Sequence, residues 1–162
     1  MFKSEIKFNG RNRRPPRDPV NVMLSLGYTL LTKEITALVE ANSFEIYIGF
    51  LHGIQYGRKT LPLDLVEEFR APVIDRLVLY LFNKRIINEN DFEYRDINIV
   101  LKEEGFEKFI RAYEKWMTER HKNENSFRST LRAQIGKFRR AIHDHAAYVP
   151  YKWGEADVSG EL

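Results

Sequence analysis

The sequence predicts an all-α fold built as a single helical domain. Apolar residues recur at helical spacing in several separate segments, which is typical of helices that bury one face. Proline, aspartate and serine stand at the starts of these segments, where helices prefer them. The 162 residues suffice for one domain with a buried core and are too few for two of ordinary size.

The composition excludes several classes of function. The chain has no cysteine, so disulfides, zinc–thiolate sites and redox motifs are absent, which fits a reducing cytoplasm. Charges interrupt the apolar runs well short of a membrane span and no signal peptide pattern appears, so we expect a cytoplasmic protein without membrane contact. The net charge of +3 argues only weakly for a polyanionic partner. The basic residues nevertheless gather in two groups, which are Arg11, Arg13, Arg14 and Arg17 and, near the other end, Arg128, Arg132, Lys137, Arg139, Arg140 and Lys152.

Residues 1–19 are expected to form an extended basic lead. The prolines at 15, 16 and 19 remove amide donors and disfavour helix in the residues before them. The arginines of this lead either contact phosphates or pack against the domain, and the sequence leaves both open. We expect the helical domain over residues 20–153 and a mobile acidic tail over residues 154–162.

The first helix is expected over residues 20–40. Asp18 can cap it, Pro19 suits its first position, and Asn42 is a candidate left-handed terminator. Gly27 lowers helix propensity, which is tolerable if another helix packs closely there. The apolar stripe consists of Val20, Met23, Leu24, Leu30, Leu31, Ile35, Leu38 and Val39.

Two further helices are expected to follow an apolar segment at residues 44–52, which is either a short strand or a buried linker. Pro62 fits the first turn of the next helix, and Pro72 is expected to end it before a core helix over residues 73–83. The charged residues at 70–76 either orient the acids before them or form ordinary surface ion pairs.

The second half of the chain predicts two amphipathic helices after a polar excursion at residues 84–98. A brief strand is expected at residues 97–101, and a hairpin there is only weakly indicated. The helix over residues 103–117 presents Phe106, Phe109, Ile110, Tyr113 and Trp116 on one side, a pattern typical of a core face. Ser126 can cap the last helix, whose buried stripe is expected to be Phe127, Leu131, Ile135, Phe138 and Ile142. His143 and His145 are interpreted as structural or surface residues.

A candidate metal site lies in residues 47–70. His52 ends the apolar segment, and Asp64, Glu67 and Glu68 follow at spacings that place three carboxylates on one face of a helix. Imidazole nitrogen and carboxylate oxygen are ordinary ligands of divalent metals. A basic turn with Arg58 and Lys59 lies between them, which favours a phosphodiester substrate. From spacing alone, a solvated acidic edge is the commoner interpretation.

Several motifs in the correct order give the sequence a resemblance to a known family. The runs GFLH, YGR and LDLVEEFRAPVIDRLVL are similar to the carboxy-terminal helical domain of Cas1, the integrase of CRISPR adaptation. The run RNRRPPRDPVNVMLSLGYTLL resembles that family's stretch from a basic Pro-Pro segment into a long helix. Gln134 and the run YVPYKW resemble its closing helix and aromatic ending, so the likeness covers about residues 8–153.

The resemblance implies a metal-dependent DNA endonuclease and integrase. It implies that His52 and Glu67 are catalytic and hold a magnesium or manganese ion, with Asp64 as an accessory acid. It also implies a homodimer, a partner in the small Cas2 protein, and attack of a DNA 3′-hydroxyl on a phosphodiester of the CRISPR repeat. The family's third ligand, a glutamate before the Pro-Pro segment, has no counterpart here, nor has its amino-terminal β domain. The residues expected to contact DNA are Arg58, Lys59, Arg13 and Arg14.

The lack of that glutamate leaves three hypotheses. The chain is part of a split integrase whose β domain and third ligand come from a separate chain, or it is a non-catalytic DNA-binding or scaffolding fragment of the adaptation complex. A helical adaptor whose acidic helix is merely solvated is the third. Metal binding that needs both His52 and Glu67 separates the first from the others, and salt-sensitive DNA binding separates the second from the third.

Overall fold

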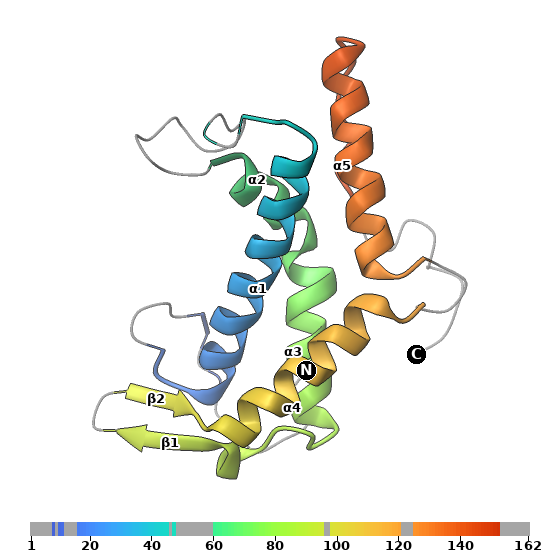
Figure 1. Ribbon diagram of the computed structural model, residues 1–162. Helices are drawn as coiled ribbons and strands as arrows, with labels where there is room; N and C mark the ends of the chain where they lie inside the picture. Colours follow the sequence, from blue (N-terminus) through green and yellow to red (C-terminus); the bar gives the residue numbers. More distant parts are fainter. Residues whose placement is uncertain are drawn as a thin grey trace.

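A computed structural model describes residues 8, 10–11, 16–45, 47, 60–95, 98–120 and 125–152. Helices dominate this part of the chain, and a two-stranded hairpin is the sheet within it, which confirms the predicted helical fold (Figure 1). The elements are α1 (Pro19–Ala41), α2 (Thr60–Phe69), the π-helical turn η1 (Arg70–Asp75), α3 (Arg76–Asn83), the 3₁₀ turn η2 (Glu89–Asp91), β1 (Phe92–Arg95), β2 (Asn98–Leu101), α4 (Glu103–Thr118) and α5 (Phe127–His143). Predicted site residues outside the described ranges are His52, Arg13, Arg14, Arg58 and Lys59.

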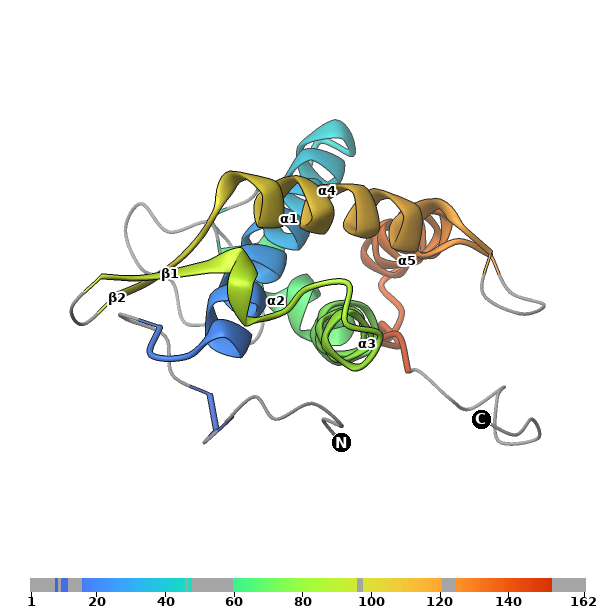
Figure 2. The same ribbon diagram turned by 90° about the horizontal axis from the view of Figure 1, so that it is seen from below.

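Helix α1 is the central element, in contact with α2, η1, α3, α5 and β2 (Figures 1 and 2). Its predicted start is confirmed, because Asp18 accepts a hydrogen bond from the Asn21 amide at 2.8 Å and Pro19 opens the helix. The predicted end is wrong in detail: Asn42 keeps a negative φ, and Ser43 takes the left-handed conformation with φ 60°.

The apolar composition of α1 corrects the expectation that every apolar run is too short to span a membrane. By length and composition alone this helix could cross a membrane. Core helices meet the same two criteria, and α1 buries most of its predicted stripe in the core. The residues of that stripe that are buried are Val20, Met23, Leu24, Leu31, Ile35 and Val39.

Helices α2 and α3 form one continuous helical rod, so the prediction that Pro72 ends a helix is wrong. Proline has no amide hydrogen and clashes with the carbonyl four residues earlier in an α-helix. Here Pro72 is buried inside η1, where hydrogen bonds span five residues instead of four and the wider turn accommodates the ring. The rod therefore continues past Pro72 to Asn83.

Gly27 allows α1 to pack directly on this rod, as the sequence predicted. A Cβ added at Gly27 would lie 2.6 Å from Cγ2 of Ile74 and 3.5 Å from Cζ of Phe109. Ile74 comes from η1 and Phe109 from α4, and both are fully buried. The missing side chain thus sets the distance between three elements of the core.

The strand expected at residues 97–101 is present as β2, paired antiparallel with β1 so that Phe92 lies opposite Leu101. Before the hairpin, Asn88 and Asp91 cap η2 reciprocally, and Lys108 of α4 reaches the Asp91 carboxylate at 2.6 Å. Helix α4 buries Phe109 and Tyr113 as expected. Phe106 contradicts the prediction, because it is 45% exposed at the first turn of α4, the end that adjoins the hairpin.

Helix α5 begins as predicted, with the Ser126 hydroxyl accepting a hydrogen bond from the Ser129 amide. Its stripe is buried from Phe127 to Phe138, but Ile142 is 52% exposed, so that part of the prediction is wrong. The reason is visible in Figure 1, where the last turns of α5 project beyond the helices on which its first half packs. His143 and His145 are exposed on this projecting end, consistent with surface residues.

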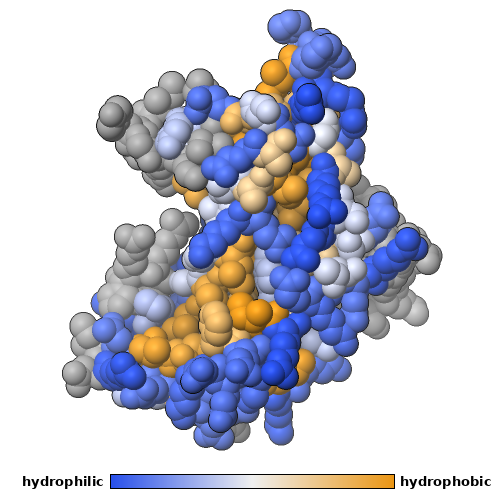
Figure 3. Space-filling model, in the orientation of Figure 1, coloured by the Kyte–Doolittle hydropathy of each residue, from blue (hydrophilic) through white to orange (hydrophobic). Residues whose placement is uncertain are grey.

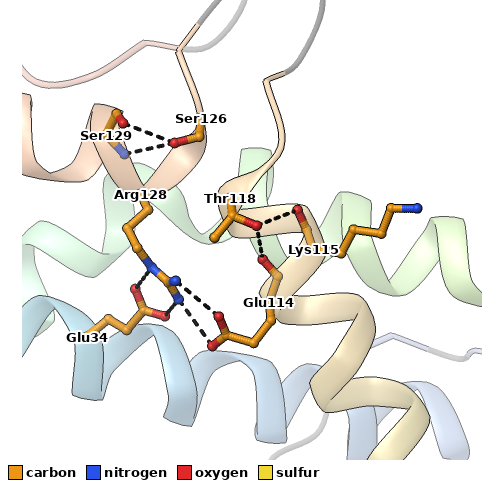
Figure 4. A network of polar contacts seen from close by, with 7 residues as sticks. All are labelled: Glu34, Glu114, Lys115, Thr118, Ser126, Arg128 and Ser129. Atoms are coloured by element: carbon orange, nitrogen blue, oxygen red, sulfur yellow. Dashed lines mark hydrogen bonds and ion pairs between the residues drawn. The ribbon is translucent and has the colours of Figure 1, made fainter.

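Arg128 ties α1, α4 and α5 together. Its guanidinium lies 2.7 Å from a carboxylate oxygen of Glu34 on α1 and 3.0 Å from one of Glu114 on α4 (Figure 4). Each of the two carboxylates receives two hydrogen bonds from the Arg128 guanidinium. Arg128 was grouped with the basic residues near the end of the chain, but these contacts give it a role in helix packing.

Candidate metal and DNA site

The three predicted acids of α2 have three different environments. Asp64 is fully buried, Glu67 is 45% exposed at its side chain, and Glu68 is half-buried. The three carboxylates therefore do not form one solvated acidic edge. Glu67 is the most exposed of the three carboxylates.

Glu67 forms an ion pair with Arg70 one turn further along the rod. The same guanidinium nitrogen, Nη1, lies 2.7 Å from one carboxylate oxygen and 2.8 Å from the other. The guanidinium also stacks over the Tyr28 ring of α1, 4.4 Å from the ring centroid. The Tyr28 hydroxyl donates a hydrogen bond to Asp75, so two residues of η1 contact the same tyrosine.

The environment of Tyr28 changes its acidity. Burial is the largest cause, and the hydrogen bond and negative charge of Asp75 add to it, so that the pKa of Tyr28 is raised to about 12. The nearby Arg70 acts in the opposite direction. The phenol therefore stays protonated and remains a donor to Asp75 over the whole range of ordinary pH.

Arg11 of the lead also lies near the Tyr28 ring. Its guanidinium is 5.3 Å from the Tyr28 ring centroid and donates to the Asn21 side chain at 2.8 Å and to the Ser25 hydroxyl at 3.2 Å. Of the two alternatives for the arginines of the lead, packing on the domain is therefore the one that holds for Arg11. The predicted DNA contacts Arg13 and Arg14 lie outside the described residues.

Glu68 holds the segment that follows α5. The Tyr148 hydroxyl donates to both Glu68 oxygens at 2.8 and 2.9 Å, and the Tyr151 amide donates at 2.7 Å. The Tyr151 ring stacks on Phe69 at 4.8 Å. Figure 2 shows this returning segment, at the red end of the colour scale, between α5 and the helical rod. Burial raises the pKa of Glu68, and the bonds to Tyr151 and Tyr148 partly oppose that rise.

A hydrogen bond joins the start of α2 to Tyr47. The Thr60 hydroxyl donates to the Tyr47 carbonyl at 2.6 Å, which joins the two residues that flank positions 48–59. Tyr47 and Thr60 are thus in contact one turn before Asp64, and His52, which stands between them in the sequence, lies outside the described residues. Within the described ranges, no group of three His, Cys, Asp or Glu side chains is arranged to hold a metal ion.

The other predicted basic group lies mainly on α5. Arg132, Lys137, Arg139 and Arg140 are exposed there, whereas Arg128 is engaged by Glu34 and Glu114. Figure 3 shows hydrophilic residues over most of the visible surface of α5, while apolar residues gather where the hairpin adjoins α1. The exposed residues of α5 are available for an anionic partner such as a phosphate backbone.

Two parts of the site were not assigned from the sequence. The pair of Glu67 with Arg70 is one of the ion pairs that the sequence left open for the charged residues at 70–76. Tyr28 and the segment at 148–151 were not connected to this helix, because hydrogen bonds across 47 and 80 residues have no signature in local periodicity. The aromatic run YVPYKW was the one visible signal of the second contact.

A family model described as "CRISPR associated protein Cas1" matches residues 1–115. The chain is 43% identical over 120 residues to the CRISPR-associated endonuclease Cas1 3 of Thermus thermophilus, a match that covers 74% of this chain and 36% of the relative. It is 37% identical over 164 residues to the CRISPR-associated endonuclease Cas1 of Leptospira interrogans, covering 93% and 62%. The matches thus span between about a third and two thirds of these relatives' lengths.

Solved structures share the fold. A CAS1 protein from Thermotoga maritima superposes with a TM-score of 0.80 at 30% identity, over 89% of this chain and 46% of that protein. A chain of a partial Cas6-RT-Cas1–Cas2 complex gives a TM-score of 0.82 at 25% identity, over 95% and 48%. A casposase bound to an integration product gives 0.81 at 20% identity over 96% and 45%, a likeness of fold alone.

Proposed function

The chain belongs to the Cas1 family, and on that premise we propose that it forms the helical, catalytic part of a metal-dependent DNA integrase of CRISPR adaptation. The reaction is attack of a DNA 3′-hydroxyl on a phosphodiester, which inserts spacer DNA into the CRISPR array. The observation that carries this proposal is the exposed Glu67 carboxylate on α2, whose first residue, Thr60, donates a hydrogen bond to Tyr47.

The proposed cofactor is a magnesium or manganese ion held by His52 and Glu67. The donor set suits such an ion, because carboxylate oxygen and imidazole are among its usual ligands. Glu67 is accessible, being 45% exposed. When bound, the ion supplies Lewis-acid stabilisation of charge on the phosphodiester. Asp64 is the accessory acid, and its full burial suits a residue that acts through its neighbours rather than by direct contact with substrate.

Four basic residues position the DNA in the proposed reaction. Arg58 and Lys59 precede α2 directly, and Arg13 and Arg14 precede α1. Their contacts with phosphate oxygens are independent of base sequence and weaken as salt concentration rises. The projecting, basic end of α5 extends the same kind of surface.

The proposed partners are DNA, a second copy of this chain and the Cas2 protein. Support for Cas2 comes from similar solved structures, which are described as Cas6-RT-Cas1–Cas2 complexes. The proposed reaction also needs the family's third metal ligand, a glutamate, and the family's β domain. The complex is proposed to work in the cytoplasm, in keeping with the absence of cysteine.

Metal binding and strand transfer test this proposal together. We expect the 162-residue chain to bind Mn²⁺ weakly and to integrate DNA only when a fragment carrying the β domain and the glutamate is added. His52→Ala and Glu67→Ala should each abolish the restored activity. Glu107→Ala is the matched control, since Glu107 is an exposed glutamate paired with Arg111 on α4, remote from α2. Restored activity that survives Glu67→Ala contradicts the assignment of that ligand.

The second candidate function is a non-catalytic DNA-binding or scaffolding fragment. The ion pair that occupies both oxygens of Glu67 favours it. Under this function, DNA binding decreases steeply with salt and is unchanged by a chelator. Titrations of a fluorescent duplex at several salt concentrations, with and without chelator, separate the two candidates.

A further inference from the structure

The carboxylate proposed to bind the metal already has a cationic partner. Both oxygens of Glu67 lie within 2.8 Å of one nitrogen of Arg70, although the carboxylate is 45% exposed. A divalent ion and this guanidinium therefore need the same oxygens. Exposed ion pairs usually exchange readily with water, so the strength of the competition depends on how firmly Arg70 is held.

The π-helical turn fixes Arg70 against α1. In an α-helix, residues five apart point in directions about 140° apart, whereas hydrogen bonds that span five residues bring such residues about one turn apart on the same side. Arg70 and Asp75 are five apart, and both contact Tyr28: the guanidinium lies over the ring and the carboxylate accepts from the hydroxyl. Tyr28 thus holds the arginine in place from a different helix.

From this geometry we infer that Arg70 is the counter-ion of Glu67 in the metal-free protein and competes with the divalent ion for the carboxylate. Tyr28 is a positioning residue that acts through Arg70. The inference rests on the proposed function, because it needs Glu67 to be a metal ligand. Without a metal ion, the positive charge of Arg70 compensates the exposed Glu67 carboxylate. Metal binding therefore requires that Arg70 release at least one oxygen of Glu67.

Binding of Mn²⁺ alone to the full chain tests the competition, with free Mn²⁺ followed by electron paramagnetic resonance. Arg70→Gln removes the competing cation and should increase Mn²⁺ affinity up to about fivefold, the range expected for an exposed ion pair. Arg76→Gln is the charge-matched control, because Arg76 is exposed on the same rod without a contact to Glu67 among those described. Equal effects of the two substitutions, or weaker Mn²⁺ binding by Arg70→Gln, overturn the inference.

The role of Tyr28 is tested by a double-mutant cycle. Tyr28→Leu removes the ring beneath the guanidinium and should increase Mn²⁺ affinity when Arg70 is present, by less than Arg70→Gln does. In the Arg70→Gln background the same change should have no effect on affinity, because Tyr28 acts only through Arg70. An equal effect of Tyr28→Leu in both backgrounds contradicts the positioning role. A thermal melt of each variant establishes that the compared proteins are folded.

Glu67→Ala distinguishes failure of this inference from failure of the proposed function. If Mn²⁺ affinity is the same in Glu67→Ala as in the parent chain, Glu67 is not a metal ligand, and the metal site of the proposed function is refuted. If Glu67→Ala lowers the affinity while Arg70→Gln leaves it unchanged, Glu67 is a ligand and only the competition is refuted.

Discussion

Gly27→Ala tests the close packing of α1 on the helical rod. Two opposing effects decide the result. Alanine is favoured over glycine inside a helix by about 1 kcal/mol. Against this, the new Cβ would meet Cγ2 of Ile74 at 2.6 Å, well inside the roughly 3.5–4.0 Å of a good carbon contact.

The steric effect should win. Ile74 is fully buried and β-branched, so its χ1 rotates poorly, and Phe109 closes the other side. Overpacking of this kind costs about 1–3 kcal/mol, and the stiff surroundings favour the upper half of that range. We therefore expect a net loss of about 1–2 kcal/mol, which for a domain of this size lowers the melting temperature by about 2–8 °C.

Gly136→Ala provides the control in urea and thermal unfolding. Gly136 lies inside α5, and the nearest atom to an added Cβ there is the Arg140 guanidinium at 4.0 Å. The same substitution should therefore stabilise the protein by up to about 1 kcal/mol. Ile74→Ala should cost less in the Gly27→Ala background than in the parent, since the added methyl fills part of the space. If Gly27→Ala is as stable as the parent while Gly136→Ala is stabilised, the packing argument is wrong.

Three further predictions concern stability. Arg128→Met should cost about 2–3 kcal/mol in urea unfolding, because it leaves two carboxylates facing each other without their cation, whereas Arg111→Met, at an exposed pair, should change stability by less than about 0.5 kcal/mol. The raised pKa of Tyr28, about 12 when folded against about 10 when unfolded, means that the unfolded chain loses this proton first. Stability should therefore fall as pH rises from about 10 to 12, and less so in Tyr28→Phe; identical pH profiles would refute this. A chelator should leave the circular dichroism and the melting temperature unchanged, because the described core consists of apolar side chains, and a loss of helical signal would mean that a metal is structural.

Local patterns in the sequence predicted most of the helices and their starts. Asp18 and Ser126 cap α1 and α5 through hydrogen bonds to nearby amides, and such contacts depend only on neighbouring residues. The significance of Gly27 was also predictable, since a glycine inside a helix indicates close approach of another element. Phe106 and Ile142 were placed wrongly because periodicity shows which side of a helix is apolar but not how far its partner helices extend.

The site was less predictable than the fold. Glu67 and Arg70 are three residues apart, a spacing at which side chains on a helix meet, and their pair falls within the ion pairing left open for residues 70–76. The effect of Pro72 was predicted wrongly, because a proline in a helical pattern usually ends the helix and the π-helical alternative is rare. Tyr28 could then not be placed, since its contact with both Arg70 and Asp75 depends on that turn.

The η1 turn makes the length of the rod critical. Each residue of an α-helix advances the direction of its side chain by about 100°, so removing one residue from the turn would restore α-helical bonding and rotate α3 by about that angle relative to α2. The buried residues Leu77, Val78 and Leu81 would then face away from the core while Glu67 stayed in place. Substitutions at Ala71, which is exposed, should be tolerated, whereas a deletion or insertion of a single residue nearby should not.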